Sequence, residues 1–179
     1  SGTNRVMTSP DGEVWTGHAS SGDSKFWNNI TWSPELGLFC AVAGSGTNKV
    51  MTSPDGIVWT AYAASNEANT WVGITWSAEL GLFCSVSVDG TNRVMTSPDG
   101  VVWTGYASSN ETNEWFSVTW GAEVGLFCAV SITGTNRIMT SPNGVTWTGL
   151  AASTDTISWY SVTWSTELGL FCAIGPGNE

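Results

Sequence analysis

The chain has 179 residues, of which 41% are hydrophobic and 11% charged, a composition typical of one folded domain and unlike that of a disordered chain. Fifteen acidic and five basic side chains give a net charge of −10, which excludes nucleic acid and anionic membranes as partners because few cations are available to neutralise phosphates. No apolar run approaches the roughly 20 residues that span a bilayer, so we expect a soluble protein, either intracellular or part of a virion or surface assembly.

A repeat of 44 residues runs through the whole chain. It is visible in the regular spacing of Trp15, Trp59, Trp103 and Trp147, and the other eight Trp and the four Cys keep the same step. Four copies account for 176 residues and leave no room for a linker. The sequence therefore predicts a single domain, 1–179, whose repeats are 1–44, 45–88, 89–132 and 133–176.

Each copy is predicted to hold four short antiparallel strands. Residues 1 to about 18 carry two of them, and in the last part of the chain the four follow as Asn136–Ser141, Val145–Thr148, Trp159–Trp164 and Leu168–Ile174. The third of these alternates aromatic and β-branched residues with polar ones, and the fourth is continuously apolar. A four-stranded repeat of this length with Trp in every copy is typical of a β-propeller blade, so the predicted fold class is an all-β, four-bladed propeller.

The chain starts and finishes partway through a blade. If the aromatic strand is innermost, residues 1–18 supply the two outer strands of a composite blade and residues 157–175 supply its two inner strands. The prediction is a monomer in which these ends pair and close a four-bladed ring, leaving no exposed sheet edge. The alternative is an eight-bladed ring made by two chains that swap their end strands.

Most of the twelve Trp are predicted to fill the wedge between neighbouring blades, where burying one indole removes about 150 to 250 Å² from water. The candidate exceptions stand where a variable loop meets the innermost strand, and they are Trp27, Trp71, Trp115 and Trp159. The variable loops add the amides of Asn66, Asn69, Asn110 and Asn113. Because the CH face of a sugar stacks on an aromatic ring while its hydroxyls bind amides, these residues are predicted to form weak sites for neutral glycans, one at each junction between blades, that act together.

A turn motif, SPDGxxW, occurs once per repeat, and its third residues are Asp11, Asp55, Asp99 and Asn143. Their short side chains can accept backbone N–H groups across the turn while Gly takes a positive φ, so we predict a structural role. The motif resembles the Asp-box hairpin of bacterial-neuraminidase-type repeat propellers. The longer pattern GLFCAV…GTNRVMTSPDGVVWT is similar to repeat propellers of phage and viral structural proteins and of bacterial surface proteins. This resemblance implies a propeller whose motif lies away from any active site.

Sialidase chemistry would need an arginine cluster, a Tyr nucleophile and acidic partners. Four of the five basic residues hold one repeat position, so symmetry spreads them around a ring, and they are Arg5, Lys49, Arg93 and Arg137. The acidic residues are also copies of one another, and no glycosidase pair or metal site can be assigned among them. The sequence therefore predicts that the chain is not an enzyme and has no catalytic residues, metal or cofactor.

The four cysteines hold one position in four different blades, and they are Cys40, Cys84, Cys128 and Cys172. A disulfide needs Cα atoms within about 7 Å, and equivalent points on neighbouring blades should lie farther apart. We predict four free, buried thiols.

The loops that precede the innermost strands vary in residue and charge, whereas the turns on the opposite face hardly change between copies. Binding residues usually lie on loops held by a rigid scaffold, so the variable face is the candidate ligand surface. The predicted function is a lectin-like or adhesion module, tail-associated or on a surface, that binds neutral glycans or a surface protein. The alternative is a symmetric scaffold without a ligand, engineered or recently amplified.

Overall fold

The computed structural model describes residues 4–22 and 24–176, so residues 1–3, 23 and 177–179 of the predicted domain lie outside the described residues. Sixteen strands and no helix occur in the described part, which confirms the all-β class. They form three four-stranded antiparallel sheets and two two-stranded sheets. Among these residues, no helix is long and apolar enough to cross a membrane.

Three blades are complete, and each is a meander whose strands pair in chain order. The first contains β3 (Trp27–Ser33), β4 (Leu38–Ala43), β5 (Val50–Ser53) and β6 (Thr60–Tyr62). The second contains β7 (Trp71–Ser77), β8 (Leu82–Ser87), β9 (Val94–Ser97) and β10 (Thr104–Tyr106). The third contains β11 (Trp115–Gly121), β12 (Leu126–Ser131), β13 (Ile138–Ser141) and β14 (Thr148–Leu150). The first strands of successive blades, β3, β7, β11 and β15 (Ser161–Ser165), contact one another and form the inner side of the array.

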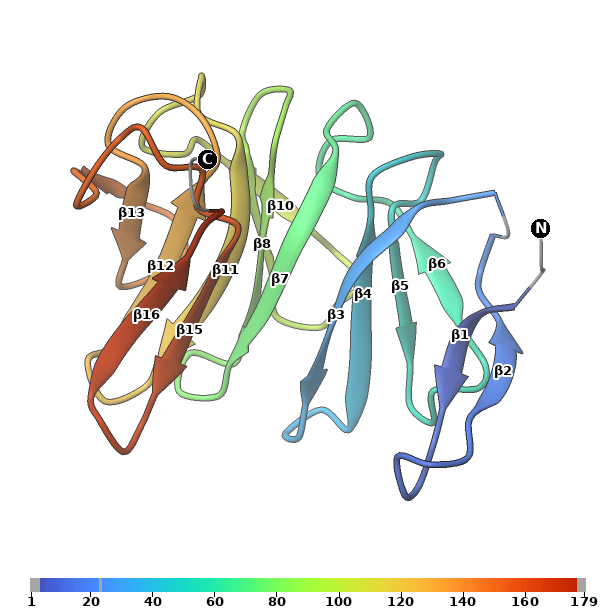
Figure 1. The fold of residues 1–179 in the computed structure, drawn as a ribbon. Coiled ribbons are helices and arrows are strands. Elements are labelled where there is room, and N and C mark those ends of the chain that lie inside the picture. The colour runs from blue at the N-terminus through green and yellow to red at the C-terminus, as the bar shows by residue number, and fades with distance from the viewer. Residues whose placement is uncertain (1–3, 23, 177–179) are drawn as a thin grey trace.

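The remaining strands form two half-blades. One consists of β1 (Asn4–Thr8) and β2 (Thr16–Ala19), and the other of β15 and β16 (Leu170–Ile174). Figure 1 shows them at opposite ends of the row of blades. Within the described residues, β1 pairs only with β2 and β16 only with β15, so the predicted closure of a four-bladed ring within one chain is absent. A four-bladed ring needs a turn of about 90° between successive blades. The two half-blades of this chain are separate sheets at opposite ends of the row, so its four repeats do not complete a full turn.

The core lies between neighbouring blades. In the first interface, Cys40 and Val42 of one sheet pack with Trp71, Ile74 and other apolar residues of the next. The equivalent cluster between the second and third complete blades repeats this pattern with Cys84 and the other residues one period later. These flat apolar faces are what the Trp-rich repeat predicts, because large side chains fill the wedge between sheets.

This packing between blades buries three of the four cysteines. The cysteines of β4, β8 and β12 are buried, whereas Cys172 of β16 is exposed, and all four are free. The prediction of four buried thiols is therefore wrong for Cys172. In the complete blades the equivalent Cys is covered by the following blade, and no blade follows β16 in the described part of the chain. Burial raises the pKa of the other thiols, that of Cys128 to about 12.

The SPDG turn closes each hairpin between the third and fourth strands of a unit. In the first complete blade, Oδ1 of Asp55 accepts the backbone N–H groups of Ile57 at 2.8 Å and Val58 at 3.0 Å. Gly56 has φ +73°, a conformation that favours glycine, and its carbonyl accepts the indole N–H of Trp59 at 3.0 Å. Asp11, Asp99 and Asn143 make the same pair of backbone bonds in their own turns.

Candidate functional site

The Trp residues at the start of the inner strands are mostly core. Trp71 and Trp115 are fully buried, and each indole N–H donates to a backbone carbonyl, of Asn66 and of Asn110, at 3.1 Å. A buried ring has no face to offer a sugar, so the glycan-stacking prediction is wrong at these two positions. Trp27 and Trp159 are half-buried because each adjoins a half-blade.

The predicted Asn ligands hold loops in place. Asn69 and Asn113 are fully buried, and their Nδ2 groups donate to the carbonyls of Thr91 at 3.0 Å and Thr135 at 2.8 Å. They tie the loop before an inner strand to the loop between the second and third strands. As glycan-binding residues, both predictions are wrong, because their Nδ2 groups are already bonded within the protein and the whole side chains, including the unpartnered Oδ1 atoms, are covered.

Asn66 and Asn110 are less buried but also have local partners. Oδ1 of Asn66 accepts the N–H of Ala68 at 3.0 Å, and Oδ1 of Asn110 accepts the N–H of Thr112 at the same distance. Each turn so formed brings a backbone carbonyl to the neighbouring indole. At these two junctions the Trp and its Asn neighbours therefore contact each other and leave no open pocket of the predicted kind.

The residue immediately after each of these Trp is placed differently. The pairing of β11 with β12 shifts between Trp115 and Ser117, so Phe116 lies at a bulge, and the same shift occurs at Asn28 and Val72. A bulge redirects a side chain, and bulges are frequent beside functional sites. The Trp is identical in all four copies, whereas the next residue is Asn28, Val72, Phe116 or Tyr160.

These variable residues meet on the inner side of the array. A cavity of about 230 Å³ opens between the four inner strands, and we call it the channel mouth. It is lined by Asn28, Asn29, Val72, Phe116, Ser117, Tyr160 and Ser161. None of these positions was among the site residues predicted from the sequence. The signal for them was the difference between copies at one strand position, next to a residue that never changes.

The channel mouth combines aromatic rings with neutral polar groups. Phe116 and Tyr160 meet edge to face, with ring centroids 5.1 Å apart and an interplanar angle of 75°, and Tyr160 is 44% exposed. Nδ2 of Asn28 donates to the carbonyl of Trp71 at 2.8 Å, which leaves its Oδ1 available. Oδ1 of Asn29 accepts the N–H of Ile30 at 2.7 Å, which leaves its Nδ2 available.

None of the seven lining residues is charged. Across the described part of the chain, no group of three or more His, Cys, Asp or Glu side chains is arranged to hold a metal ion. The channel mouth therefore suits a neutral ligand that has an apolar face and hydrogen-bonding groups.

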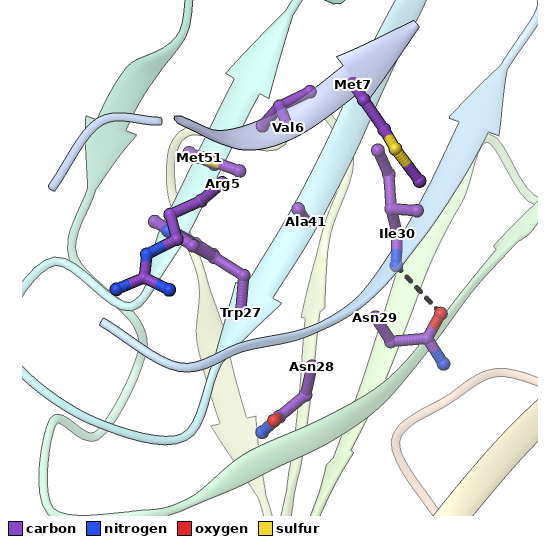
Figure 2. Close-up of a pocket in the computed structure, with 9 residues that line it drawn as sticks. All are labelled: Arg5, Val6, Met7, Trp27, Asn28, Asn29, Ile30, Ala41 and Met51. Atoms are coloured by element: carbon purple, nitrogen blue, oxygen red, sulfur yellow. Dashed lines mark hydrogen bonds between the residues drawn. The ribbon is translucent and has the colours of Figure 1, made fainter. Parts of the chain in front are cut away.

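A second hollow, of about 220 Å³, lies beside β1 and β3. Figure 2 shows it lined by Arg5, Val6, Met7, Trp27, Asn28, Asn29, Ile30, Ala41 and Met51. Its walls are mainly apolar side chains of the first complete blade and of the N-terminal half-blade. This hollow lies in the space between two blades, where the complete interfaces have packed side chains.

No protein-family model and no curated protein sequence matches the chain, but solved structures do. Virginiamycin B lyase from Staphylococcus aureus superposes with a TM-score of 0.79 at 16% identity, over 92% of this chain and 54% of that one. The computationally designed Ika4 protein gives a TM-score of 0.60 at 9% identity, over 89% and 96%. A chain of the nidogen/laminin complex gives 0.60 at 14%, over 87% and 58%.

These likenesses show the fold, which is a β-propeller. This chain spans about half the length of the lyase, with 54% of that chain covered. The neighbours include an enzyme, a member of a protein complex and a designed protein, so the fold is compatible with several kinds of function.

The prediction that the chain is not an enzyme is wrong, because the structure that it resembles at the highest of these TM-scores is a lyase. The prediction rested on the repeated acids and bases being spread around a ring. An active site does not have to use the repeated positions, because residues that differ between copies can meet, as they do at the channel mouth.

Proposed function

We propose that the chain is a recognition module that binds a neutral carbohydrate at the channel mouth. The observation that carries this proposal is the lining itself, which joins an edge-to-face aromatic pair to unpartnered amide and hydroxyl groups without any charge. All of it comes from strand positions at which the four repeats differ, on the side where the variable loops lead into the inner strands.

The exposed ring of Tyr160 is the stacking platform for the CH face of a sugar. Its hydroxyl and that of Ser161 have no partner among the described residues, and neither has Nδ2 of Asn29. A site of this size should bind one or two sugar units weakly, in the high micromolar to millimolar range of about −4 to −6 kcal/mol. Several copies of the site on one assembly would raise the overall affinity.

A glycan array of neutral sugars, followed by calorimetric titration of the best ligand, tests the proposal. Tyr160→Ala should lower the affinity at least tenfold, because it removes the stacking face. Phe26→Ala is the matched control, since Phe26 is an aromatic residue that is 74% exposed and lies outside the channel mouth. Equal losses in both variants, or binding that survives in Tyr160→Ala, would place the site elsewhere.

The second candidate function is a symmetric scaffold without a ligand. The observation that favours it is the near-identity of the four repeats, together with the likeness to a designed protein matched over 96% of its length. Absence of binding to any neutral glycan or surface protein would support this candidate.

The SPDG hairpins support a further part of the proposal. We infer a relationship to the Asp-box repeat propellers of phage, viral and bacterial surface proteins. A carbohydrate-binding module of that kind would act at a virion or cell surface.

A further inference from the structure

The two half-blades complement each other. A complete blade such as the second has the order β7-β8-β9-β10 from the inside outwards. The C-terminal half-blade holds the strands equivalent to β7 and β8, and the N-terminal half-blade holds those equivalent to β9 and β10. Within the described residues, the outer edge of β16 and the facing edge of β1 have no strand beside them. Unpaired edges of this kind readily accept a strand from another chain.

Apolar side chains are exposed on these half-blades at positions that are buried in complete blades. Met7 is 62% exposed, whereas its counterpart Met95 is fully buried. Cys172 and Ile174 are exposed, whereas Val86, the counterpart of Ile174, is fully buried. Only the missing neighbour distinguishes the two environments, because the side chains are the same or similar in size.

The hollow in Figure 2 is the space of the missing neighbour. In the first complete interface, Cys40 and Val42 pack on Trp71 and Ile74 of the following blade. One repeat earlier, the receiving residues are Trp27 and Ile30, which line the hollow. The side chains that should fill it are those at the repeat positions of Cys40 and Val42. In the C-terminal half-blade these are Cys172 and Ile174.

We propose that the β15–β16 half-blade of a second copy of this chain docks against β1 and fills this hollow. When two chains pair in this way around a twofold axis, the N-terminal half-blade of each chain binds the C-terminal half-blade of the other, and both ends of each chain are paired. The result is an eight-bladed ring with no free edge. The proposal is independent of the proposed carbohydrate site.

The curvature of the array favours a ring of two chains over one closed by a single chain. The 92% of this chain that superposes on the lyase corresponds to only 54% of that propeller chain. Four repeats with that curvature make about half of a ring. A second copy supplies the other half.

The complete blades set the register of the proposed pairing. In β4 and β5, Cys40 lies opposite Thr52 and Ala41 opposite Met51. The same register places the partner's Cys172 opposite Thr8 in β1. The N–H of Ala43 donates to the carbonyl of Lys49, and antiparallel pairs alternate, so the Cys40–Thr52 pair and its counterpart are non-hydrogen-bonded pairs.

One side-chain hydrogen bond recurs between neighbouring blades. The indole N–H of Trp76 donates to Oε2 of Glu35 in the preceding blade at 2.6 Å, and Trp120 makes the same bond to Glu79. The equivalent Trp32 is 41% exposed and has no acceptor among the described residues. In the proposed ring, the blade before Trp32 contains the partner's Glu167, which holds the repeat position of Glu35 and would accept this bond.

Light scattering and a cysteine pair test the proposal on the chain of 179 residues. The reduced wild-type protein should have twice the 18.9 kDa mass of one chain. Thr8→Cys should then form a disulfide with the partner's Cys172, because Cα atoms of a non-hydrogen-bonded pair are about 4.5 Å apart, within disulfide range. Mild oxidation should give a covalent dimer on a non-reducing gel, and reduction should reverse it.

Two controls assign the disulfide to the proposed edge. Thr16→Cys places a thiol on the adjacent strand β2, one strand farther from the partner, and should give no covalent dimer. Thr8→Cys combined with Cys172→Ser should also give none. A monomer in light scattering, a disulfide formed within one chain, or assemblies larger than two chains would each overturn the two-chain ring.

Discussion

The SPDG turn allows the role of a single carboxylate oxygen to be measured. In the second complete blade, Oδ1 of Asp99 accepts the N–H of Val101 at 2.8 Å and of Val102 at 3.0 Å, and Oγ of Ser97 donates to the same oxygen at 2.9 Å. Asp99→Ala leaves both amides without an acceptor in the protein. Each such bond contributes about 0.5 to 1.5 kcal/mol net, and water reaches this exposed turn, so we expect a loss of about 1 to 2 kcal/mol.

Asp99→Asn separates the hydrogen bonds from the charge. The fourth repeat carries Asn143 at this position, and its Oδ1 accepts the N–H groups of Val145 at 2.9 Å and Thr146 at 3.0 Å. The amide therefore keeps the geometry, and Asp99→Asn should change the free energy of unfolding by less than about 0.5 kcal/mol at neutral pH.

The negative charge of Asp99 should affect the stability of the protein at acidic pH. Hydrogen bonds from the N–H groups of Val102 and Val101 lower the pKa of the Asp99 carboxyl from its ordinary value of 3.8. A lowered pKa contributes stability that is fully present above about pH 4 and is lost as the pH falls through the pKa of the folded state. Asp99→Asn should remove this part of the acid sensitivity.

Thermal unfolding followed by near-ultraviolet circular dichroism measures both effects. A loss of 1 to 2 kcal/mol corresponds to a fall in Tm of about 2 to 8 °C for a domain of this size. Asn143→Asp is the reverse control and should be tolerated at neutral pH. Equal destabilisation by Asp99→Ala and Asp99→Asn would refute the hydrogen-bond argument, and so would a neutral Asp99→Ala.

Trp115→Ala should cost about 3 to 5 kcal/mol in urea unfolding, because it empties a fully buried site, and a loss under about 1 kcal/mol would contradict the packing. Gly73→Ala should cost about 1 to 3 kcal/mol in the same assay, since its Cβ would lie 3.1 Å from the Phe116 carbonyl oxygen on the next inner strand. An unchanged unfolding midpoint for Gly73→Ala would show that β7 and β11 can move apart at no cost in stability. The three thiols of β4, β8 and β12 should react with a thiol reagent only when the fold opens, because burial raises their pKa. Rapid reaction of all three in the native protein would refute that burial.

The amino-acid sequence by itself determined the local structure of this protein. Alternation in Trp159–Trp164 and the apolar run in Leu168–Ile174 predict adjacent strands, and the structure pairs β15 with β16 there. The SPDG turn could also be predicted, because an Asp acceptor and a Gly at positive φ act within a few residues of chain. These features depend on neighbours along the sequence, where propensity and side-chain periodicity are decisive.

The candidate site could not be read from the repeat in the same way. Trp71 was expected to face a ligand, but the blade before it covers its ring completely. Phe116 was overlooked, although a bulge beside the neighbouring Trp115 turns it toward the channel mouth. Burial of a Trp and the direction of a bulged residue depend on contacts between blades, which a pattern within one repeat does not contain.

Only the tertiary structure shows whether the two end strands pair within one chain. The sequence shows that the two ends carry complementary halves of a blade, and that holds equally for a closed ring in one chain and for a ring of two chains. Which of the two rings forms depends on the angle between neighbouring blades. That angle results from the summed volumes of the side chains packed between two sheets, such as Trp71, Phe83 and Met95. Small differences in that packing add up along four blades, and in this chain they leave β1 and β16 apart.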